Sequence, residues 1–166
     1  MRRLMSFVVV AGLVAGMTAR ADEQKVALDK VPKVVKKAVK KRFPDAKLKS
    51  AEKETENGKT VYEIAITDKD QKIEVTLTPE GQIVGIEKQI AAKDLPQAVT
   101  KTLEGKYPKA TYKVIEEVFK VKDGEEKLAY YEVLLVTAEK KKLEVSVKSD
   151  GKIEKEEDKS KEKSEK

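Results

Sequence analysis

The segment VPKVVKKAVKKRFPDA, residues 31–46, decides the expected fold of this chain. A related segment, LPQAVTKTLEGKYPKA, occupies residues 95–110, so its first residue stands 64 positions after that of the first segment. Both segments have proline at the second position, and both end in an aromatic residue, proline, one variable residue and alanine. A recurrence at a fixed period is typical of a duplicated structural unit.

Apolar residues in the first segment recur at intervals of three and four, which predicts an amphipathic helix. This stripe consists of Val31, Val34, Val35, Ala38, Val39 and Phe43. Lysines fill the other side, so the helix could lie on a membrane surface. The second segment keeps the apolar stripe but replaces several of these lysines, for example Lys33 by Gln97. We therefore expect a helix that covers a sheet.

Strand patterns follow each helical segment. Residues 60–67 and 73–78 alternate between apolar and polar side chains, and Asp68-Lys69-Asp70 marks the turn between them. After the second helical segment, Tyr131-Glu132-Val133 corresponds to Tyr62-Glu63-Ile64 of the first repeat. The predicted fold class is α+β, with two tandem repeats that each consist of one helix packed on a four-stranded antiparallel sheet.

Four parts are expected along the chain: a signal peptide at 1–21, a first repeat at 22–90, a second repeat at 91–154, and a charged disordered tail at 155–166. The tail is assigned because it contains no large apolar residue that could be buried in a core. The pattern leaves open whether the two repeats share one continuous sheet.

The N-terminus has the features of an export signal. Two arginines follow Met1, residues 4–17 are mostly apolar, and Ala19 and Ala21 stand at the −3 and −1 positions of a cleavage site after residue 21. The alternative is a retained membrane anchor. We expect a periplasmic or secreted protein with no membrane span in the mature chain. Cleavage lowers the formal charge from +6 to +3, because the leader holds three arginines and no acid.

The composition narrows the chemistry. The chain contains no cysteine, histidine or tryptophan, which excludes disulfides, thiolate and imidazole catalysis, and the usual zinc, copper and haem ligands. We therefore expect no cofactor. Arg42 is the only arginine after the leader, whereas proteins that read nucleic acids usually rely on arginine, so no nucleic-acid partner is expected.

One expected sheet face is more apolar after the second helix than after the first. If Tyr131 points toward its helix, the opposite face carries Tyr130, Leu134 and Val136. An uncovered apolar face suggests a contact surface. The alternative, packing of this face against the other repeat or the tail, is equally compatible with the pattern.

These motifs resemble the PepSY-like domains, and most of all their beta-lactamase-inhibitor-like branch. The resemblance covers about residues 29–154 in two tandem copies. It rests on Phe43-Pro44-Asp45-Ala46, Tyr62-Glu63-Ile64 and Gly81, and again on Tyr107-Pro108-Lys109-Ala110, Tyr131-Glu132-Val133 and Gly151.

The resemblance implies a small secreted module that binds proteins or peptides, with a hairpin loop that enters the cleft of an enzyme. The matching hairpin tips are Asp68-Lys69-Asp70 and Glu139-Lys140-Lys141. The leading hypothesis is thus an exported, non-enzymatic, monomeric module that binds an unidentified protein or peptide and inhibits a peptidase or another envelope enzyme. Candidate partner-binding residues are Tyr130, Leu134, Val136, Asp68, Lys69 and Asp70.

The sequence is compatible with two further functions. A cell-envelope protein that binds a ligand or a cation such as calcium could use the Glu116-Glu117 pair or the Asp68 and Asp70 turn, because hard cations prefer oxygen ligands. An enzyme could use the carboxylate pairs Glu63 with Glu74 and Glu132 with Glu144, which the alternation places on one sheet face. The symmetry of these two pairs favours sheet geometry over catalysis, so no enzyme is expected.

Overall fold

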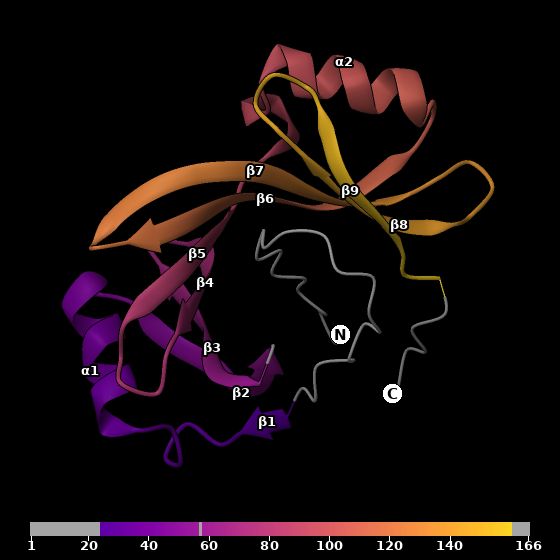
Figure 1. Cartoon of the computed structure of the whole chain (residues 1–166). Helices are drawn as coiled ribbons and strands as arrows, with labels where there is room; N and C mark the ends of the chain where they lie inside the picture. The colour runs from indigo at the N-terminus through magenta and orange to yellow at the C-terminus, as the bar shows by residue number, and fades with distance from the viewer. Residues whose placement is uncertain (1–23, 57, 161–166) are drawn as a thin grey trace.

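A computed structural model of the chain describes residues 24–56 and 58–160. The predicted signal peptide, with Ala19 and Ala21, lies outside the described residues. The described part forms two α-helices, one short 3₁₀ helix and one antiparallel sheet of nine strands (Figure 1). The strands follow one another in the sheet in the order of the sequence, from β1 to β9.

The first part of the chain comprises β1 (Gln24–Val26), α1 (Lys33–Arg42), β2 (Lys47–Glu56), β3 (Lys59–Asp68), β4 (Gln71–Leu77) and β5 (Ile83–Gln89). The second part comprises the 3₁₀ helix η1 (Ala92–Asp94), α2 (Gln97–Lys106), β6 (Thr111–Lys122), β7 (Glu125–Val136), β8 (Lys142–Val147) and β9 (Ile153–Asp158). No helix in the described ranges is long and apolar enough to cross a membrane.

The predicted fold class is wrong, because the described chain forms two helices and a single nine-stranded sheet instead of two repeats that each have one helix on a four-stranded sheet. Strands β5 and β6 pair with each other, with Glu87 opposite Val118, and this pairing joins all nine strands into one sheet. Two separate sheets would each leave another edge of unpaired backbone groups, and the β5–β6 pairing satisfies them.

Both ends of the sheet also differ from prediction. Residues 24–26 form β1 and pair with β2, which adds a strand to the four expected in the first repeat. The predicted disordered tail is wrong for residues 155–158, because Ile153–Asp158 is strand β9 and pairs with β8. Charged residues suit an edge strand, where they discourage pairing with other chains.

Each helix packs on the same face of the sheet and buries its own apolar cluster. Helix α1 contributes Val35 and Val39, and α2 contributes Val99 and Leu103, all of which are fully buried. Tyr131, Val133 and Leu135 belong to the α2 cluster, which confirms that this side of β7 faces the helix. The sheet is curved, and both helices lie on its outer side (Figure 1).

Two glycine turns fit closely against the helices. Gly151 has a φ of +88°, and a Cβ atom there would lie 2.8 Å from the carbonyl oxygen of Ala98 in α2. The hydroxyl of Thr102 donates a hydrogen bond of 2.9 Å to the carbonyl oxygen of Gly151. Gly81 has a φ of +85°, and its Cβ would lie 3.0 Å from Val34 in α1. Only glycine combines this backbone conformation with so close an approach.

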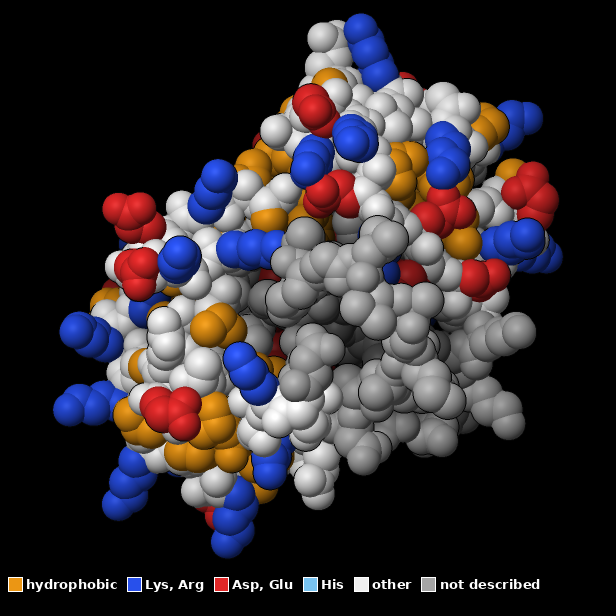
Figure 2. Space-filling view, in the orientation of Figure 1, with side chains coloured by type: hydrophobic (Ala, Val, Ile, Leu, Met, Phe, Trp, Pro, Cys, Tyr) orange, Lys and Arg blue, Asp and Glu red, His pale blue; other side chains and the backbone are white. Residues whose placement is uncertain are grey.

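Lysine and arginine side chains are spread over the surface in view, with acidic side chains among them (Figure 2). No compact basic patch is seen on the described part of this face.

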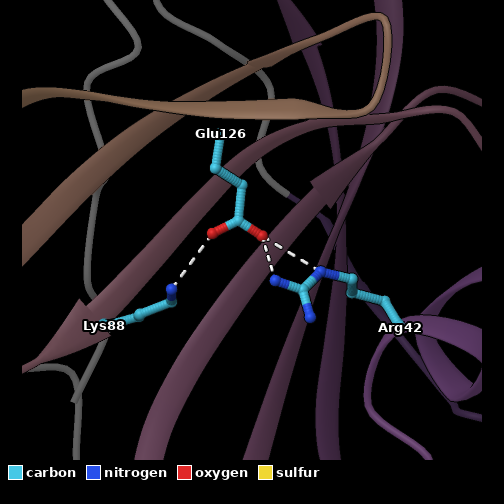
Figure 3. Close-up of polar contacts among 3 residues, drawn as sticks. All are labelled: Arg42, Lys88 and Glu126. Carbon is cyan, nitrogen blue, oxygen red and sulfur yellow. Dashed lines mark hydrogen bonds and ion pairs between the residues drawn. The ribbon is translucent and has the colours of Figure 1, made fainter.

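A polar contact joins the C-terminal end of α1 to the C-terminal end of β5 and the N-terminal end of β7 (Figure 3). Glu126 in β7 accepts hydrogen bonds from the guanidinium of Arg42, the last residue of α1. Its other carboxylate oxygen lies 3.1 Å from the ammonium nitrogen of Lys88 in β5. Burial alone would raise the pKa of Glu126, but these two cations outweigh it and lower the pKa. The long β6–β7 hairpin is thereby held against the first helix.

Candidate functional site: the acidic face of the sheet

The sheet face opposite the helices carries a row of glutamates. We call it the acidic face. Each strand from β2 to β9 places at least one glutamate there, as the strand registers show: Glu52, Glu54, Glu63, Glu74, Glu87, Glu116, Glu132, Glu144 and Glu157.

The alternation of the strands creates this row. In β3, β4, β7 and β8 the glutamate stands between two apolar residues, as in Tyr62-Glu63-Ile64 and Leu143-Glu144-Val145. Successive side chains of a strand point to opposite faces. When the apolar neighbours pack under the helices, the glutamate must therefore point to the other side. The continuous sheet then brings the glutamates of all these strands side by side.

Several of these carboxylates are buried, and their pKa values are raised. Burial raises the pKa of Glu132 to about 8, and the charges of Glu144 and Glu116 add to the effect. Burial also raises the pKa of Glu87 well above its ordinary range, with Glu132 and Glu116 contributing. The pKa of Glu63 is raised by burial and by its contact with Glu74. The face therefore holds protons near neutral pH.

Three carboxylates meet at the centre of the acidic face. Glu116 and Glu132 are direct cross-strand partners in β6 and β7, and Glu87 lies on β5 beside them. One oxygen from each lies within 4.8 Å of the others. Glu87 is 4% exposed, and its Oε2 atom has no hydrogen-bond partner among the described residues. The hydroxyl of Ser146 lies 3.5 Å from Glu132 Oε2, at the limit of a hydrogen bond.

The candidate residues on β7 lie on the acidic face. Leu134 stands opposite Glu144, Tyr130 stands opposite Val118, and Val136 follows in the same alternation. Leu134 and Val136 are half-buried. Tyr130 is buried, and burial raises the pKa of its hydroxyl. The structure thus places these three residues around Glu132; their role in binding stays a prediction.

The candidate residues Asp68, Lys69 and Asp70 lie elsewhere. They form the turn between β3 and β4, where Lys69 and Asp70 are exposed and have positive φ angles. Strand β3 is four strands from β7 in the sheet, which corresponds to about 19 Å. The hairpin tip and the β7 residues are therefore not parts of one small site.

Some of the predicted carboxylate pairs share one sheet face in the structure, and others do not. Glu63 with Glu74, and Glu132 with Glu144, do share one sheet face, as predicted. The suggested cation site at Glu116-Glu117 is wrong, because Glu117 stands opposite Tyr131 and points to the helix side. The Asp68 and Asp70 turn does not belong to the group of three carboxylates found among the described residues.

Glu87 was missed by sequence reasoning. Its neighbour in space, strand β6, follows α2 in the chain and is therefore distant in sequence. Only the β5–β6 pairing brings Glu87 next to Glu116. The available signal was a glutamate in each strand from β2 to β9, together with the open possibility of one continuous sheet.

Comparison with known families agrees with this architecture. Residues 32–81 match the family model described as peptidase propeptide and YPEB domain, PepSY. Residues 84–155 match the model provisionally described as beta-lactamase-inhibitor-like, PepSY-like. The chain belongs to the PepSY-like proteins. In this PepSY-like chain the first match ends at residue 81 and the second begins at residue 84. The paired strands β5 and β6 therefore both lie in the second match, apart from the first residue of β5.

Solved structures share the fold of this PepSY-like protein. A protein of the DUF2874 family from Bacteroides uniformis has a TM-score of 0.65 at 16% identity, covering 78% of this chain and 91% of its own. A BLIP-like protein from Bacteroides fragilis has a TM-score of 0.57 at 17% identity, covering 76% and 85%. A protein from Bacteroides eggerthii, provisionally described as periplasmic, has a TM-score of 0.60 at 14% identity, covering 78% and 90%. No curated protein matches the sequence.

Proposed function

We propose that this PepSY-like protein is an exported, non-enzymatic binding protein whose acidic face binds a basic segment of a protein or peptide partner. One observation carries the proposal: eight adjacent strands each present a glutamate on the face that the helices leave uncovered. Opposite charge attracts such a partner and sets its orientation.

The energetic position of the glutamates supports a binding role. Carboxylates such as Glu63 and Glu132 are buried among like charges, and this raises their pKa values. An apolar residue of similar size at these positions would avoid the cost of burying a charge. A lysine or arginine of a partner would offset part of that cost, as Lys159 already does through its ion pairs with Glu144 and Glu157.

The apolar residues beside Glu132 supply contact area. Leu134 and Val136 are half-buried on the same face as the glutamate row. Interfaces combine an apolar centre with charged groups that select the partner. A segment that places aliphatic and basic side chains in alternation fits this surface best.

The proposal includes export to the periplasm or the cell exterior, and inhibition of the enzyme that is bound. The residues 1–21 have the pattern of an export signal, and the provisional description of the Bacteroides eggerthii protein as periplasmic is consistent with it. The BLIP-like description of the Bacteroides fragilis protein favours inhibition of an enzyme. In that case the exposed turn Asp68-Lys69-Asp70 is the element expected to reach the enzyme cleft.

Two peptides of equal length, one rich in lysine and arginine and one rich in aspartate and glutamate, test the proposed charge preference. Fluorescence anisotropy with the purified exported protein is expected to show binding of the basic peptide alone. Leu134→Lys should weaken it, because it adds positive charge beside Glu144. Val34→Lys is the matched control, since Val34 is an exposed apolar residue of α1 on the other side of the sheet. Equal binding of both peptides, or equal loss in both variants, would refute the proposal.

A further inference from the structure

The cluster of Glu87, Glu116 and Glu132 has a geometry that general charge complementarity does not explain. Its three carboxylates come from three adjacent strands, and one oxygen of each lies within 4.8 Å of the others. Each of the three residues is at most 6% exposed, so water screens their repulsion weakly. Carboxylates this close must share protons or a cation.

The Oε2 atom of Glu87 favours a bound cation over shared protons. A proton shared between two carboxylates joins only one oxygen of each, so protons alone leave other buried oxygens of the cluster without a partner. Glu87 Oε2 is buried and has no such partner among the described residues. Leaving a buried acceptor unsatisfied costs about 1–3 kcal/mol. An ion at the centre of the cluster would give this oxygen its partner.

We propose that Glu87, Glu116 and Glu132 form a binding site for a divalent cation with a preference for oxygen ligands, and that calcium fits it best. Calcium binds oxygen at about 2.3–2.6 Å, so one ion can join atoms up to about 4.6–5.2 Å apart. Magnesium demands near-ideal octahedral geometry and gives up its water reluctantly, whereas calcium accepts the irregular geometry that three side chains fixed on three strands offer. Carboxylates are poor ligands for softer metals, which select thiolate or imidazole.

This proposal goes beyond the proposed function, because it needs three side chains and no protein partner. Water would complete the coordination sphere, since three carboxylates supply at most six oxygens and calcium takes about six to eight. The strands position the ligands firmly: Glu116 and Glu132 are paired across β6 and β7, and β5 is bonded to β6 along Gly85–Gln89.

Calorimetric titration of calcium chloride into the exported protein, stripped with a chelator that is then removed, is the direct test. We expect one ion per chain with an affinity of about 10⁻⁴ to 10⁻³ M, the range of extracellular calcium modules. Glu87→Gln should weaken binding about tenfold or more, because it removes one charged ligand. Glu117→Gln is the matched control on the helix side of β6 and should leave the affinity unchanged.

Thermal melting provides a second readout that also reports folding. Calcium should raise the melting temperature of the parent protein and of Glu117→Gln, but not of Glu87→Gln, which is expected to fold because it removes a buried charge. A folded parent protein with no calcium heat and no shift at about 10 mM calcium would overturn the proposal, as would an unchanged affinity in Glu87→Gln. Neither result bears on peptide binding, which is measured without calcium.

Discussion

Glu116 and Glu132 stand directly opposite each other on β6 and β7, with both carboxylates on the face that the helices leave uncovered. Like charges in direct cross-strand pairs destabilise a sheet. This pair also lies next to Glu87, in the middle of the sheet rather than at its edge. The arrangement therefore costs stability, and the proposals above give it a binding role.

Stability should fall as the pH rises from about 5 to 8. The pKa of Glu132 is about 8 in the folded chain, against an ordinary value of 4.5, so the folded chain keeps a proton that the unfolded chain loses. The stability that this carboxyl contributes is full below pH 4.5 and is lost as the pH rises through 8. The pKa of Glu132 also depends on the charged groups that face it, which are Glu87, Glu116, Glu144, Lys155 and Lys159.

Thermal melting in the presence of a chelator checks this dependence. The loss between pH 5 and pH 8 should be at least about 1 kcal/mol, or about 3 °C for a chain of this size. Glu132→Gln, which cannot titrate, should show a smaller change. A melting temperature that increases from pH 5 to pH 8 in the parent protein would contradict the raised pKa values.

The turn at Gly151 should tolerate no side chain. Gly151→Ala puts a Cβ at 2.8 Å from the α2 backbone and from the Thr102 hydroxyl. Gly124→Ala is the control, because Gly124 has a similar φ of +83° but open space around it. We expect the control to cost about 1–2 kcal/mol from backbone strain alone, and Gly151→Ala at least about 1 kcal/mol more. Equal losses on chemical denaturation would show that the turn does not pack against α2.

The contact between Arg42 and Glu126 should be visible as a pKa change. Arg42→Ala removes one of the two cations that lower the pKa of Glu126, so the pKa of that carboxyl should rise. The loss of stability should stay below about 1 kcal/mol, because the Arg42 side chain is 48% exposed and surface ion pairs contribute little. An NMR titration of the Glu126 carboxyl measures the shift. Lys37→Ala, an exposed lysine of α1, should leave it in place, and a shift of equal size there would argue against a specific contact.

Calcium and a basic peptide should compete, because both proposals use the carboxylates of Glu87, Glu116 and Glu132. Added calcium is expected to weaken binding of the basic peptide to the parent protein more than added magnesium does at the same concentration. In Glu87→Gln the two ions should act alike, since only general screening remains. Anisotropy measurements at constant ionic strength make this comparison. Equal effects of both ions on the parent protein would mean that the cluster does not couple cation and peptide.

Local patterns predicted the elements of this fold well. The apolar stripes placed α1 and α2, and the alternation around Glu63 and Glu132 correctly assigned one face to the helices and one to the glutamates. The sheet as a whole was predicted wrongly, because the pairing of β5 with β6 depends on backbone groups and carries no side-chain signal. The cluster at Glu87 depends on that pairing and could not be found without it. Most of strand β9 was assigned to the tail because it has only one apolar residue, Ile153.

Crosslinking in the native cell envelope, followed by mass spectrometry, tests the central claim most directly. The acidic face carries its own lysines, Lys25, Lys72 and Lys155, while Lys37 and Lys101 lie on the helices. We predict that a protein or peptide partner is crosslinked through a basic segment to the lysines of the acidic face. A partner crosslinked only to Lys37 and Lys101, or one with an acidic segment at the crosslink, would contradict the claim that the acidic face is the binding surface.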